Sequence, residues 1–181
     1  REALTATLLE DLHAGNLDVV LCALPVGPDL REMEAAVLFE DPFVLAVQAA
    51  GSDDAPGTAE AIVATAPLLL LEEGHCLRDQ ALAVCAKDKE RRLVNFGATS
   101  MTTLLQLVSN GLGLTLLPEI AIPVETAHLH SLTITPFAEP MPHRDIALFW
   151  RKSSRRLPDF GALAGAITEV AGEILPEAEA A

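Results

Sequence analysis

The sequence predicts an α/β fold, and two observations lead to this class. Short apolar runs alternate along the chain with stretches whose apolar residues have helical spacing. Half of the 181 residues are apolar and only 4% are aromatic, so the chain can bury a sizeable core that is mainly aliphatic. A chain of this length suits one domain or two small lobes.

Two stretches near the start of the chain carry specific expectations. The run LDVVLCALP at 17–25 is almost continuously apolar, which predicts a strand buried on both faces, as in a parallel sheet. Residues 35–48 contain two apolar runs separated by Asp41 and Pro42, which predict two short strands.

The other expected elements follow from apolar spacing, helix caps and glycine or proline stops. Ser100 or Thr99 suits the N-cap of one helix, and Gly111 suits its end. The expected helices cover 3–14, 76–87, 100–111 and 157–175, and the expected strands cover 66–73, 93–99, 112–119, 129–137 and 144–151. A loop is expected at 51–57 and a frayed tail at 176–181.

The formal net charge is -14, from 26 acidic and 12 basic residues. Nucleic acids are bound through clusters of Lys and Arg, so this balance argues against DNA binding by the chain itself. The basic runs at 87–92 and 151–156 are short and predict solvated surface. No apolar run approaches the roughly 20 residues that span a bilayer, and no signal peptide is visible. The start at Arg1, within helix-forming sequence, suggests a fragment of something longer.

Three cysteines are too few for a disulfide scaffold and suit a reducing cytosol, where a disulfide would be transient and regulatory. Cys22 lies inside the 17–25 run and predicts a buried core thiol. Cys76 stands where a buried strand meets a helix. The helix start, His75 and Arg78 there favour the nucleophilic thiolate. The alternative is a cysteine that merely packs at the turn.

Cys85 follows Cys76 by nine residues. If one helix spans both, their Cα atoms lie roughly 13 Å apart, whereas a disulfide needs about 7 Å or less. Bridging would therefore require unwinding, and oxidation would change the conformation. Otherwise Cys85 is a small buried hydrophobe that never pairs. A metal site is only weakly indicated, because His75 and the two cysteines lack a second ligand pair at zinc spacing, and His128 and His130 are typical of surface.

Two motifs carry a family resemblance: LEEGHCLRDQALAVC at 71–85 and ATSMTTLLQLVSNGLGLTLLP at 98–118. Together with nearly the whole chain, they resemble the regulatory domain of the OxyR group, the peroxide sensors among LysR-type transcription regulators. The GHCLRDQ motif with its second cysteine is specific to that group, whereas the other motif is shared more widely among LysR-type regulators.

The resemblance implies a LysR effector domain of two α/β lobes, like type II periplasmic binding proteins. One lobe would comprise 1–42 plus 145–181, without its first strand and helix. The other would comprise 43–144 and carry the redox cysteines. The resemblance also implies an N-terminal winged helix-turn-helix domain that is absent from this chain.

The resemblance further implies roles for five residues. Cys76 would be the peroxidatic cysteine, oxidised by hydrogen peroxide to a sulfenic acid, and Cys85 would resolve it into a disulfide. His75 would lie beside the reactive thiol, Arg144 would favour the thiolate, and Thr5 would line the peroxide pocket with His75 and Cys76. Cellular thiol reductants would reset the switch.

The implied protein is a cytoplasmic sensor of peroxide that controls antioxidant genes, rather than an enzyme. It would use no cofactor or metal and would not bind membranes. It would act as a homodimer, or as a tetramer at full length, and contact DNA only through the missing domain.

Two alternatives stay open. One is a LysR-type effector domain that binds a small organic co-inducer between its lobes. The other is a thiol peroxidase, although the sequence shows no thioredoxin-like CxxC.

Overall fold

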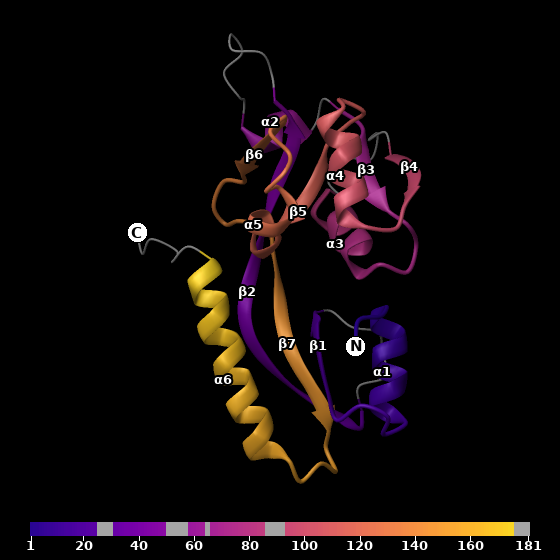
Figure 1. The fold of residues 1–181 in the computed structure, drawn as a ribbon, viewed down its shortest axis with the longest axis vertical. Helices are drawn as coiled ribbons and strands as arrows, with labels where there is room; N and C mark the ends of the chain where they lie inside the picture. Colours follow the sequence, from indigo (N-terminus) through magenta and orange to yellow (C-terminus); the bar gives the residue numbers. More distant parts are fainter. Residues whose placement is uncertain (25–30, 50–57, 64–65, 86–92, 176–181) are drawn as a thin grey trace. The chain divides into compact units, whose positions relative to one another are not determined.

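The structure, a computed structural model, describes residues 1–24, 31–49, 58–63, 66–85 and 93–175 (Figure 1). The chain divides into two compact units, in which unit 1 comprises Arg1–Asp41 with Arg144–Ala181 and unit 2 comprises Pro42–His143. The expected loop at 51–57, the basic run at 87–92 and the tail at 176–181 lie outside the described residues.

Helices and strands alternate along the chain, which confirms the α/β class. The helices are α1 (Thr5–His13), α2 (Ala59–Val63), α3 (Cys76–Cys85), α4 (Met101–Ser109), α5 (Ile122–Glu125) and α6 (Leu157–Ile174), with a 3-10 turn at Glu119–Ala121. The strands are β1 (Val19–Ala23), β2 (Met33–Gln48), β3 (Leu68–Leu71), β4 (Leu93–Ala98), β5 (Thr115–Pro118), β6 (Leu132–Pro136) and β7 (His143–Arg151). Sequence patterns did not predict α2, α5 or the 3-10 turn, because such short elements carry little apolar periodicity.

Unit 1 is a sheet with a helix on each face (Figure 1). Leu12 of α1 packs with Val20 of β1 and Phe149 of β7 in one apolar cluster. The next residue of β7, Trp150, places its ring 5.8 Å from that of Phe160 in α6. Because successive strand residues point to opposite faces, α1 and α6 cover opposite sides of the sheet.

The expectation for the 17–25 run was wrong in its pairing and its burial. β1 pairs antiparallel with β7, and Leu21 is 44% exposed. β1 stands at the end of the strand order, and an antiparallel sheet can leave part of a strand in water. Cys22 is half-buried rather than buried, and it packs against the cluster beneath α1.

The two strands expected within 35–48 are one continuous strand, β2. Its pairings with β5 and β6 begin at Phe43 and Val44, after the proline. Asp41, before the proline, contacts Arg144 of β7. Pro42 therefore lies where the neighbours of β2 change, a place where the missing N–H of a proline is tolerated.

Unit 2 is built around β3, which is buried along its whole length. β3 pairs in parallel with β4, and a bridge between Leu68 and Leu114 links it to the segment that enters β5. Helix α4 packs on this sheet through Leu104 and Val108. Ser100 is confirmed as the N-cap of α4, because its side chain accepts a hydrogen bond from the Thr103 N–H at 3.2 Å. No helix in the described part of the chain has the length and apolar character that crossing a membrane requires.

Candidate functional site

A tight turn joins β3 to α3 and carries His75 and Cys76. Gly74, in this turn, has φ of +95°, a backbone conformation that glycine adopts without a Cβ clash. The His75 carbonyl then accepts a hydrogen bond from the Arg78 N–H at 3.0 Å, which closes the first turn of the helix. The turn therefore sets Cys76 as the first residue of α3.

Cys76 and His75 are both half-buried. The first N–H groups of a helix have no helical acceptor, and the aligned peptide dipoles leave a partial positive charge at this end. A thiol that is partly accessible in such surroundings can act as a nucleophile. The predicted reactive cysteine is therefore half-buried at the N-terminal end of a helix.

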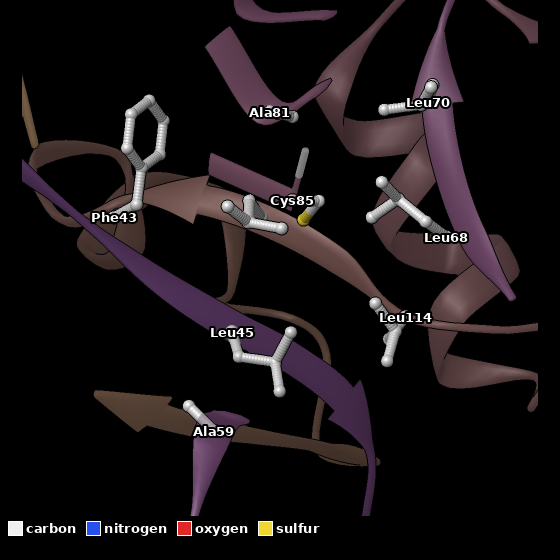
Figure 2. Packing of buried hydrophobic residues seen from close by; sticks show 9 residues of the cluster. Phe43, Leu45, Ala59, Leu68, Leu70, Ala81, Cys85 and Leu114 are labelled. Carbon is white, nitrogen blue, oxygen red and sulfur yellow. The ribbon is translucent and has the colours of Figure 1, made fainter. Parts of the chain in front are cut away.

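Cys85 is the last residue of α3 and is only 8% exposed. Its side chain belongs to an apolar cluster that includes Leu68 and Leu70 of β3 and Phe43 and Leu45 of β2 (Figure 2). One helix thus spans both cysteines, and its geometry separates their Cα atoms by roughly 13 Å. All three cysteines of the chain lie in the described residues and are thiols. In this conformation, Cys76 and Cys85 are too far apart to ligate one metal ion.

Arg78 ties the first turn of α3 back to β3. Its Nη1 donates a hydrogen bond to the Leu71 carbonyl at 2.9 Å, and its Nη2 lies 3.9 Å from the Glu73 carboxylate. The Arg78 side chain is 16% exposed, whereas that of Glu73 is 87% exposed. Arg78 was expected near the thiol from its position in the sequence. The carbonyl that it binds lies seven residues earlier in the chain, and no sequence pattern marks it.

The other two predicted site residues belong to unit 1 rather than to unit 2. Thr5 begins α1 and is half-buried. Arg144, expected in the lobe of 43–144, falls in unit 1 and pairs with Asp41. Its Nε and Nη2 lie 2.9 and 2.7 Å from one oxygen of the fully buried Asp41 carboxylate. Asp41 was expected only as part of a break between strands, although an acidic residue within the apolar run VLFEDPFVL indicates a buried partner.

The LysR substrate-binding domain model matches residues 1–172. The chain belongs to the LysR substrate-binding domain family. This LysR substrate-binding domain is 44% identical over 171 residues to a probable hydrogen peroxide-inducible genes activator of Mycobacterium avium, across 92% of this chain and 53% of that protein. It is 37% identical over 174 residues to the DNA-binding transcriptional dual regulator OxyR of Escherichia coli strain K12, across 92% of this chain and 54% of that protein.

The chain spans about half the length of the curated relatives that it matches. Among solved structures, it resembles a cysteine mutant of Corynebacterium glutamicum OxyR with bound hydrogen peroxide. That match has a TM-score of 0.80 at 32% identity and covers 95% of this chain and 54% of the other. These matches confirm the resemblance and the fold class expected from the sequence. The LysR family is one of transcription regulators.

Proposed function

We propose that this LysR substrate-binding domain is the hydrogen-peroxide-sensing part of a transcription regulator. The observation that carries the proposal is the placement of two thiols at opposite ends of one helix. Cys76 is half-buried at the first residue of α3, and Cys85 is buried at the last. The names of the relatives and the peroxide-bound structure support the same stimulus.

In the first step, the Cys76 thiolate attacks one oxygen of hydrogen peroxide. An S–O bond forms, the O–O bond breaks, and the leaving hydroxide takes a proton to become water. Cys76 becomes a sulfenic acid, its sulfur oxidised by two electrons while the peroxide is reduced. On the resemblance to the OxyR group, the proposal assigns peroxide binding to Thr5 and His75 and support of the thiolate to Arg144.

In the second step, α3 unwinds and Cys85 leaves its apolar cluster. The Cys85 sulfur attacks the Cys76 sulfur, an S–S bond forms, the S–O bond breaks, and water leaves. Cys76 and Cys85 cannot form a disulfide while α3 stays helical, because they lie at its two ends. Oxidation therefore changes the conformation of unit 2. Thiol reductants of the cytosol return both cysteines to thiols.

The changed segment then alters how regulatory domains pack in a homodimer or tetramer. DNA is contacted by a separate winged helix-turn-helix domain, so the acidic character of this chain is compatible with a role in transcription. Each oxidation of the domain consumes one molecule of hydrogen peroxide, and the domain cannot react again until a reductant restores its thiols. The domain is therefore a cytoplasmic sensor rather than an enzyme that turns over.

The first test is disulfide mapping by mass spectrometry after treatment of this chain with stoichiometric hydrogen peroxide. We expect one bridge, between Cys76 and Cys85. The matched control is Cys22→Ser, which removes the third thiol and should form the same bridge. Cys76→Ser should form none. A Cys76→Ser variant that oxidises as readily as the parent chain would contradict the proposal.

The order of the two steps has its own test. Cys85→Ser removes the resolving thiol, so oxidation should stop at the Cys76 sulfenic acid. A 1,3-dione probe, which adds to sulfenic acids, should then label Cys76 in Cys85→Ser far more than in the parent chain. Equal or absent labelling in the two proteins would argue against a sulfenic acid that precedes the disulfide.

A further inference from the structure

We propose that Arg78 is a positioning residue that holds α3 in its helical thiol form and so sets how readily the Cys76–Cys85 disulfide forms. This inference rests on the proposed function, because it concerns the same redox couple. Arg78 acts through the backbone of β3 rather than by contact with peroxide.

The contact that carries the inference joins a guanidinium to the backbone carbonyl of a buried leucine. Leu71 is the last residue of β3 and is 6% exposed, and its carbonyl accepts the 2.9 Å hydrogen bond from Arg78. Hydrogen bonds from charged donors are stronger than neutral ones, and burial strengthens them further. Glu73 lies farther away and in water, so it contributes less.

Arg78 also lies inside the segment that must change. It is the third residue of α3, between the two cysteines that the disulfide would join. Its own N–H closes the first helical turn on the His75 carbonyl, while its side chain reaches back to Leu71. Unwinding α3 so that Cα atoms of Cys76 and Cys85 come within about 7 Å moves the backbone that places this side chain. The contact therefore favours the thiol form over the disulfide form.

The direction in which loss of Arg78 shifts the disulfide equilibrium follows from the presence of the contact in the thiol form alone. A contact present only in the thiol form lowers the equilibrium constant for disulfide formation, so its removal raises that constant. We expect Arg78→Met to raise it about tenfold, which makes the two-electron reduction potential about 30 mV more negative. Arg78→Lys should give an intermediate value, because an ammonium keeps the charge without the planar fork of donors.

The test equilibrates the chain with mixtures of oxidised and reduced glutathione, whose ratio sets a potential near that of the cytosol. Oxidised glutathione takes two electrons and two protons from Cys76 and Cys85 and becomes two molecules of reduced glutathione. Alkylation followed by mass spectrometry gives the fraction of chains that carry the bridge. Every protein carries Cys22→Ser, so that only one thiol pair competes. The parent chain, Arg78→Met and Arg78→Lys are compared.

Thr115→Val is the matched control for a general loss of stability. Thr115 also gives a side-chain hydrogen bond to a β3 carbonyl, that of Leu69 at 3.0 Å, but it lies outside α3. We expect the equilibrium constant for disulfide formation in Thr115→Val to stay within about twofold of that in the parent chain. The lost hydrogen bond destabilises the thiol and disulfide forms alike. In the thiol form, hydrogen exchange of the α3 amides should become faster in Arg78→Met and stay unchanged in Thr115→Val.

The outcomes separate the two proposals. If the parent chain forms the bridge and both Arg78 variants have its equilibrium constant, the inference fails and the proposed function stands. An equal shift in Thr115→Val and Arg78→Met also overturns the inference, since it would show general destabilisation. If the parent chain forms no bridge even with hydrogen peroxide, both proposals fail. Should Arg78→Met not fold, Arg78→Lys decides the question by the same measurements.

Discussion

At the scale of single residues, the roles of the charged side chains depend on their acceptors. Arg78 and Arg144 are both largely buried, but the first binds a backbone carbonyl and the second a buried carboxylate. A guanidinium on a carbonyl can be lost at modest cost, because the carbonyl is neutral. A guanidinium on the Asp41 carboxylate neutralises a charge that water does not reach.

Arg144→Met should destabilise the reduced chain by about 3–5 kcal/mol, because Asp41 keeps its buried charge and loses this cation. The free energy of unfolding in urea measures the loss. The double variant Asp41→Asn with Arg144→Met removes both charges and should recover much of it. Arg155→Met, at an exposed position of unit 1, is the control and should change stability little. A double variant no more stable than Arg144→Met would show that the ion pair is not the cause.

At the scale of elements, the segments that the sequence predicts correctly have strong local determinants. Helix α4 has a serine cap before it and a glycine after it, and Gly111 indeed has φ of +76°. Helix α3 begins at Cys76, where its start was expected. Local caps and apolar spacing act within a few residues, so they can be recognised without knowledge of the fold.

Ser100→Ala should lower the free energy of unfolding by about 1 kcal/mol, because the Thr103 N–H loses its acceptor. Urea unfolding followed by circular dichroism measures this change. Ser100→Asp supplies a side-chain oxygen at the same position and should stay close to the parent. If Ser100→Asp were as unstable as Ser100→Ala, the cap would not explain the loss.

At the scale of the whole molecule, contacts between distant segments decide how each unit is held together. In unit 2, Glu60 of α2 accepts a hydrogen bond at 2.9 Å from the N–H of Ala138, which follows β6. This donation, with a smaller contribution from the N–H of Glu60 itself, lowers the pKa of Glu60 below its ordinary value of 4.5. The contact thus connects two segments far apart in the sequence and is stronger when the Glu60 carboxylate is ionised.

The pH dependence of stability should reflect this carboxylate. Because the folded-state pKa of Glu60 is lowered, its contribution is present above the ordinary pKa and is lost as pH falls through the folded value. Glu60→Gln should therefore be less stable than the parent at neutral pH, and the two should converge in acid. Thermal melting across this range measures the difference, with the exposed Glu169→Gln as control. A gap between parent and Glu60→Gln that persists in acid would contradict this assignment.

The sequence by itself determined the α/β class, the family resemblance and the two cysteines placed one helix apart. Only the tertiary structure decided that β1 pairs antiparallel with β7, that β2 continues through Pro42, and that Arg78 reaches the Leu71 carbonyl. The physical reason is range. Caps and apolar spacing act over a few neighbouring residues, whereas strand partners are chosen by packing between segments far apart in the chain. The helix that separates the cysteines is determined by neighbouring residues, whereas the cluster that buries Cys85 is formed by segments far apart in the chain.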